Sequence, residues 1–225
     1  MGMRIMWMLA LLLAIGLVAI GSVTIWVQRE APFQQDKLVT KGRGRALILY
    51  HPSRDAHFSD DVSLALARGF EEAGYRVDRW TMTAQTPRRP EDFAVMAIVS
   101  NTYFWAPDWP TQRYLARADL SGMNVVAVIG GAGNTQRAQG ALARDIVRSG
   151  AKLTSIRALW TSRPNQPGIR KEVNHQAAMA LAHWMALDAG TKLRAALPAG
   201  LPTAARPQAH PPKPHPALDR SKETT

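Results

Sequence analysis

The sequence predicts an α/β protein: a doubly wound three-layer sandwich with a five-stranded parallel sheet, preceded by one transmembrane helix. Two observations lead to this prediction. Residues 5–28 form an uncharged, mostly apolar run, and about 20 such residues are enough to cross a hydrocarbon core of about 30 Å. Between residues 45 and 190, short apolar runs typical of strands covered on both faces alternate with segments of helical periodicity. This alternation indicates βαβ units and a mostly parallel sheet.

The flanks of the apolar run predict its orientation. Only Arg4 stands in the short flank of residues 1–4, whereas five basic residues follow the run up to the first strand: Arg29, Lys37, Lys41, Arg43 and Arg45. Because Lys and Arg are enriched on the cytoplasmic side, we expect a single-pass protein of the inner (cytoplasmic) membrane, with its domain in the cytoplasm and membrane lipid as a partner. A cleaved signal peptide is the alternative, although the apolar core of a signal peptide spans only about 7–15 residues.

Composition limits the classes of function. The chain has 225 residues, a formal net charge of +11 and no cysteine, so disulfides and thiolate metal sites are excluded. A positive charge suits either nucleic acid or an anionic lipid surface. The basic residues are scattered along the chain rather than gathered in one block. We therefore expect the lipid surface and no nucleic-acid partner.

The first half of the domain contains three expected strands and one helix. The first strand, 46–50, is an apolar run that ends in Tyr50. A helix follows from Ser59, a residue type that begins helices, to Gly74, a residue type that ends them. Residues 75–80 alternate as a strand, residues 81–90 form a proline-containing loop, and residues 93–99 form a second buried run.

The second half continues the alternation. A short helix is expected at 111–117, a third buried run at 124–129 ends at a glycine pair, and a helix at 135–149 ends before Gly150. A strand at 152–160 and a helix at 167–187 complete the domain, which we place at 45–190. Segment 29–44 is expected to be a linker, and segment 191–225, rich in proline, alanine and histidine, a disordered tail.

The parallel sheet predicts where a ligand would bind. In doubly wound sheets the ligand lies outside the carboxyl ends of the strands, near the point where strand order reverses. This rule selects the loops 50–59, 100–108 and 130–135, and we expect them to meet at one edge of the sheet.

The order and spacing of these three loops resemble the flavodoxin-like family over about residues 45–160. The resemblance is carried by the strand ending in Tyr50 with the serine-containing loop after it, by Ser100-Asn-Thr-Tyr-Phe-Trp-Ala-Pro107, and by Gly130-Gly-Ala-Gly-Asn134. It implies strand order 2-1-3-4-5, FMN as cofactor, and either electron transfer or an NAD(P)H/quinone-type oxidoreductase activity with a redox partner or quinone. The chemistry would belong to the flavin, so no catalytic residue is assigned.

The resemblance implies that the first loop holds the FMN phosphate. Ser53 and Ser59 would supply hydroxyls there, and Arg54 or His57 would add positive charge. The loop departs from the family pattern, because it has no glycine and it contains two aspartates and a proline: Pro52, Asp55 and Asp60. Ser59 is equally explained as an ordinary helix cap.

The other two loops are expected to hold the flavin ring. Tyr103, Phe104 and Trp105 offer flat apolar faces for an isoalloxazine ring. The same side chains would alternatively close the core under the loop or pack against the membrane. The remaining candidates for binding the ring are Asn101, Thr102, Gly131, Gly133 and Asn134.

Two functional hypotheses therefore remain open from the sequence. The first is a membrane-anchored FMN-binding redox protein, indicated by the strand order and the aromatic loop. The second is a flavin-free scaffold of the same fold that binds a protein partner at the membrane, indicated by the altered first loop and the proline-rich tail.

Overall fold

A computed structural model describes residues 2–54 and 57–196 of the chain. It contains five α-helices, one short 3-10 helix and seven strands within those residues. The helices are α1 (Gly2–Gln28), α2 (Phe58–Glu72), α3 (Trp109–Arg117), α4 (Gln136–Arg148), η1 (Lys171–Val173) and α5 (Asn174–Ala196). The strands are β1 (Gln35–Val39), β2 (Gly44–Tyr50), β3 (Tyr75–Thr81), β4 (Val95–Tyr103), β5 (Ala106–Pro107), β6 (Asn124–Gly131) and β7 (Lys152–Trp160).

Five parallel strands form the body of the sheet, in the order β3-β2-β4-β6-β7. Counted along the chain, this is the order 2-1-3-4-5, so the predicted topology is confirmed. The prediction of five strands is too low for the sheet as a whole. β1 pairs antiparallel with β3 at the edge, and β5 pairs antiparallel with the end of β4.

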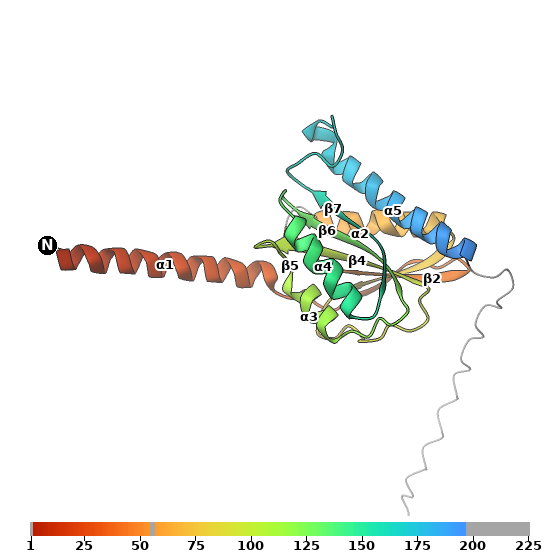
Figure 1. The fold of residues 1–225 in the computed structure, drawn as a ribbon, viewed down its shortest axis with the longest axis horizontal. Helices are drawn as coiled ribbons and strands as arrows, with labels where there is room; N and C mark the ends of the chain where they lie inside the picture. Colours follow the sequence, from red (N-terminus) through yellow and green to blue (C-terminus); the bar gives the residue numbers. More distant parts are fainter. Residues whose placement is uncertain (1, 55–56, 197–225) are drawn as a thin grey trace, which may run out of the picture.

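Helices cover both faces of the sheet (Figure 1). Alternate residues of one strand belong to different cores: Ile48 packs with the core under α2 and α5, and Leu47 packs with the core under α3 and α4. Both side chains are fully buried, as expected for a strand covered on both faces. The three layers predicted from the apolar runs are therefore confirmed.

Helices α2 and α5 cross closely because small residues line the contact. An added Cβ on Gly69 of α2 would lie 2.2 Å from the backbone oxygen of His183 in α5. Ala182 and Ala186 of α5 are fully buried against the same core. This close packing fixes the position of α2 against α5.

Two predicted boundaries differ from the structure. The segment predicted to be a linker, 29–44, contains β1, whose edge position lets it keep a polar sequence. It is also fastened to the domain before β1 begins, because Thr81 Oγ1 donates to the backbone oxygen of Pro32 and accepts from the backbone N–H of Gln34. Residues 191–196, predicted to belong to the tail, continue α5, and 197–225 lie outside the described residues.

Helix α1 stands away from the domain (Figure 1). Its apolar side chains are exposed along its length, for example Leu13 at 66%. Residues Ile5–Gln28 are long and apolar enough to cross a membrane, a property that a signal sequence near the N-terminus would share. The rest of the described chain is a folded domain at the carboxyl end of this helix.

Candidate functional site

The three predicted loops meet at one edge of the sheet. β2 and β4 are paired so that Tyr50 lies opposite Val99, and β4 and β6 are paired so that Asn101 lies opposite Gly130. The loops that follow these residues therefore leave the sheet side by side. We call this edge, where β2, β4 and β6 end, the carboxyl rim.

Direct contacts join the loops across the carboxyl rim. The Asn101 side-chain amide donates to the backbone oxygen of His51 over 2.9 Å, and the His51 N–H donates to the backbone oxygen of Val99 over 3.3 Å. The ring of Phe58, 4% exposed, lies against Gly130, where an added Cβ would be 3.4 Å from it. Asn101, predicted to bind a ring, is thus buried and used in holding two loops together.

Close packing explains why the loop after β6 contains glycines. An added Cβ on Gly131 would lie 2.8 Å from the Thr135 side chain and 3.2 Å from that of Thr102, which brings these two loops together. At Gly133 it would lie 2.9 Å from the guanidinium nitrogen of Arg163. Asn134 is exposed. The absence of a side chain at these glycines leaves room for neighbouring side chains of the same chain. One of these, Arg163, adds a cation to the rim that no sequence pattern predicted.

The aromatic loop after β4 is a tight hairpin. Tyr103 pairs with Ala106 and Thr102 with Pro107, which leaves Phe104 and Trp105 as a two-residue turn. Both turn residues have positive φ, 49° and 59°, the pattern of a type I′ turn. Their side chains are 60% and 56% exposed, so they do not close the core under the loop.

Solved structures match this one over about two thirds of the chain. A flavodoxin from the domain Archaea matches with a TM-score of 0.51 at 11% identity, over 67% of this chain and 99% of that one. A flavodoxin, WrbA-like protein from Agrobacterium tumefaciens matches with a TM-score of 0.50 at 10% identity, over 68% and 98%. A flavodiiron protein from Giardia intestinalis matches with a TM-score of 0.51 at 15% identity, over 68% of this chain and 36% of that one.

The chain has a flavodoxin-like fold. At these identities the similarity establishes the fold alone, and the site must be judged on its own residues. No family model matches the sequence, and no curated protein matches it either.

The two ends of the loop at the phosphate position of this flavodoxin-like domain are bonded to each other. The backbone N–H of Ser53 donates to Ser59 Oγ over 2.5 Å, and the N–H of Ser59 donates to Ser53 Oγ over 3.3 Å. Ser59 is 1% exposed. The two hydroxyl oxygens predicted to lie at the phosphate therefore accept hydrogen bonds from the backbone of their own loop.

The charges around this loop also oppose a phosphate. Asp60 and Asp61 occupy the first turn of α2, where carboxylates already interact with the positive end of the helix dipole. The Arg54 guanidinium lies 5.3 Å from the ring centroid of Trp26 in α1. His57 precedes α2 with φ of 62° and its side chain makes no cap hydrogen bond. As described, these residues do not fit the phosphate end of FMN.

The segment between α1 and β1 lies on the carboxyl rim. We call residues 28–34, which are the last residue of α1 and the six residues before β1, the connecting segment. Gln28 is 4% exposed, and its side-chain oxygen accepts from the N–H of Trp109 over 2.8 Å. The backbone oxygen of Arg29 accepts from His51 Nε2 over 3.2 Å, and the Glu30 carboxylate accepts from the N–H of Ala84 over 3.1 Å. These bonds therefore hold the end of α1 directly against the carboxyl rim.

A buried ion pair lies under the rim. His51 Nδ1 is 3.6 Å from Asp108 Oδ2, and the two side chains are 1% and 0% exposed. Burial alone would lower the pKa of His51, but the Asp108 carboxylate and the Arg29 carbonyl outweigh it and raise that pKa above its ordinary value. Burial would raise the pKa of Asp108, but His51 and the Asn101 and Thr111 donors lower it. No sequence motif marks His51, and its position directly after an apolar strand is the one signal that could have indicated its role.

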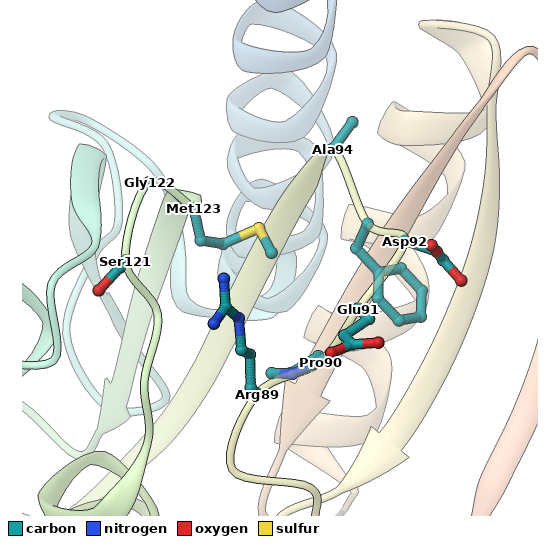
Figure 2. Close-up of a pocket in the computed structure, with 9 residues that line it drawn as sticks. Arg89, Pro90, Glu91, Asp92, Ala94, Ser121, Gly122 and Met123 are labelled. Atoms are coloured by element: carbon teal, nitrogen blue, oxygen red, sulfur yellow. The ribbon is translucent and has the colours of Figure 1, made fainter. Parts of the chain in front are cut away.

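A separate hollow lies at the opposite edge of the sheet. It has a volume of about 440 Å³ and is formed where the chain enters β4 and β6 (Figure 2). Arg89 and Met123 point toward one another across it, and Glu91 and Asp92 lie on its other side. The carboxyl-end rule for doubly wound sheets does not favour this edge, so we place no ligand there.

Proposed function

We propose that this chain is a flavin-free flavodoxin-like module, tethered to the inner membrane by α1, that acts as a scaffold at the cytoplasmic membrane surface. The observation that carries the proposal is the contact between the two ends of the loop that joins β2 to α2. Ser53 Oγ and Ser59 Oγ each accept a backbone N–H of the other residue, and Asp60 and Asp61 place two carboxylates in the first turn of α2. Both features disfavour the phosphate of FMN at this helix terminus.

The tether is supported by the composition of α1 and its flanks. Ile5–Gln28 has a mean hydropathy of 2.5 over its most apolar window, and the basic residues after it favour a cytoplasmic domain. Lipid is then a permanent neighbour of the carboxyl rim. A protein partner at the same surface would be recognised by the domain without any redox chemistry.

Titration of the full-length, detergent-solubilised chain with FMN tests the proposal. Flavin fluorescence is followed as protein is added, with riboflavin in a parallel titration and a flavodoxin as positive control. Because riboflavin lacks the phosphate, the pair separates recognition of the phosphate from recognition of the ring. We expect no saturable binding of either compound. Stoichiometric binding of FMN would overturn the proposal.

A second candidate is an FMN-dependent electron-transfer protein or NAD(P)H/quinone-type oxidoreductase. The observation that favours it is the aromatic turn of Phe104 and Trp105, next to the glycine loop on the same rim. A quinone in the bilayer would be a suitable acceptor for a rim held at the membrane. This candidate predicts that both flavins bind and that Trp105→Ala weakens both, since the ring and not the phosphate would provide the affinity.

A further inference from the structure

We propose that the turn formed by Phe104 and Trp105 inserts into the lipid interface beside α1, so that the domain docks on the bilayer through its carboxyl rim. This inference rests on the membrane tether in the proposed function. It adds a second point of contact to that tether and assigns lipid as the occupant of the aromatic turn.

The first argument is the conformation of the turn. A type I′ turn favours Asn-Gly or Gly-Gly, because both central residues have positive φ. Here the two positions hold large aromatic residues at φ 49° and 59°. Both side chains are directed outward and remain more than half exposed. Backbone strain combined with exposed apolar surface is unfavourable in water, and it indicates a surface that functions outside water.

The second argument is the position of the turn relative to α1. Gln28, the last residue of α1, is hydrogen-bonded to Trp109, which lies just beyond the hairpin. The turn and the end of α1 lie on the same side of the domain (Figure 1). Trp7 and Trp26 are separated by roughly 28 Å along the helix, close to the thickness of a hydrocarbon core. With Trp26 at the interface, no flexible spacer separates the bilayer from the rim.

The third argument is the charge beside the turn. Arg54 lies over Trp26, and Arg113 lies 5.8 Å from the ring centroid of Trp109 with its side chain 62% exposed. Glu30 partly offsets Arg113 at 3.3 Å. Aromatic residues flanked by arginines are typical of surfaces that lie at the headgroup level of anionic membranes. We therefore commit to an anionic lipid surface as the occupant.

The absence of native cysteine allows a direct depth measurement. Three single-cysteine variants of the full chain carry an environment-sensitive fluorophore: Phe104→Cys in the turn, Leu13→Cys in the middle of α1, and Glu91→Cys at the opposite edge of the sheet. Each is reconstituted into phosphatidylcholine/phosphatidylglycerol vesicles that contain a spin-labelled lipid as quencher. We expect quenching at positions 104 and 13 to exceed that at 91 by at least about twofold, as for a segment at the acyl boundary.

The three positions distinguish the failure of this inference from the failure of the tether. Quenching at 13, with position 104 no more quenched than 91, would overturn the inference and leave the tether intact. No quenching at 13 would overturn the tether and the inference with it. Equal quenching at 104 and 91 at a high level would mean that the domain lies on lipid without a preferred face, which also contradicts the inference.

A matched variant tests the aromatic contact itself. Trp105→Asp is combined with the label at 104, because aspartate tolerates positive φ and carries a charge that lipid opposes. We expect quenching at 104 to fall to the level at 91 while quenching at 13 is unchanged. In the variant that is labelled at 104 and keeps Trp105, vesicles of phosphatidylcholine alone should reduce the quenching at 104. If neither change reduces quenching at 104, Trp105 and anionic headgroups do not hold the turn, and the proposal is wrong.

Discussion

Asp108 joins the hairpin after β4 to the start of α3. Its Oδ2 accepts from the N–H of Asn101 over 2.6 Å and from Ser100 Oγ over 3.1 Å, and its Oδ1 accepts from the N–H of Thr111 over 2.9 Å. It is fully buried, so each of these bonds is shielded from water. His51 shares the same carboxylate and thereby ties the connecting segment to the rim.

The buried ion pair predicts that stability falls as the pH rises. The pKa of His51 is raised in the folded state, so folding favours its protonated form. This contribution is complete below the unfolded pKa of about 6.5 and is lost as the pH rises through the higher folded pKa. Thermal unfolding of the solubilised chain between about pH 6 and pH 9 should show this loss, and His51→Asn should reduce it. An unchanged profile in His51→Asn would contradict the assignment.

Removal of the partner carboxylate should have two effects. Asp108→Asn should flatten the same pH profile, because the carboxylate is what raises the pKa of His51. It should also destabilise the domain by about 1–3 kcal/mol at neutral pH, since the buried donors lose a charged acceptor. Urea unfolding followed by circular dichroism measures this difference. A variant as stable as the parent would show that Asp108 does not organise the rim.

At the level of elements, the hairpin of β4 and β5 is built against local preference. A two-residue turn with two positive φ values is disfavoured for Phe104 and Trp105, because each side chain has a Cβ. The pairs of Tyr103 with Ala106 and Thr102 with Pro107 hold the turn in place. The strand pairs thus maintain an aromatic turn that the turn sequence itself would not favour.

Replacement of the turn by Asn-Gly should stabilise the domain. Phe104→Asn with Trp105→Gly places preferred residues at both positions, and we expect a gain of about 1–2 kcal/mol. The midpoint of thermal unfolding, measured by circular dichroism, should rise by about 2–4 °C for each kcal/mol. Loss of stability would mean that the aromatic side chains support the fold rather than a function at the rim.

The sequence predicted the parallel strands well because their signal is local. β7 spans residues 152–160, as predicted. The buried apolar runs correctly predicted the positions of β2, β4 and β6 along the chain. The extension of β4 to Tyr103 was not predictable, because Ser100-Asn101-Thr102 is polar and becomes a strand only by pairing with β6 and β5. The same holds for β1, a polar edge strand that depends on β3.

At the candidate site the sequence predicted the place but not the contacts. The carboxyl-end rule selected three loops that do lie side by side at one edge of the sheet, since the rule depends only on topology. The reciprocal bonds of Ser53 and Ser59 and the contact of His51 with Arg29, which is 22 residues away, depend on tertiary folding and left no sequence pattern. These contacts argue against the predicted role of the first loop in binding phosphate.

On the scale of the whole molecule, one helix and one edge of the sheet meet at the same place. The connecting segment leaves α1 and lies directly on the carboxyl rim, with Gln28 buried and Glu30 bonded to Ala84. A membrane-spanning α1 would therefore set the distance of the rim from the bilayer as well as its orientation. The hollow lined by Arg89 and Glu91 lies at the opposite edge.

The proposed orientation of the chain rests on the positive-inside rule and is directly testable. In intact cells, Glu91→Cys should resist a membrane-impermeant maleimide and react only after lysis, because the domain is expected in the cytoplasm. The cysteine-free parent provides the background signal. Labelling in intact cells would place the domain outside and contradict the orientation.

The flavin content of the full-length chain, purified from membranes in detergent and then denatured, tests the central claim most directly. Denaturation releases any bound flavin for quantification against protein concentration, whatever its affinity during titration. The bonds between Ser53 and Ser59 and the carboxylate of Asp60 at the start of α2 predict flavin far below one molecule per chain. Flavin near one molecule per chain would contradict the account and establish the redox candidate in its place.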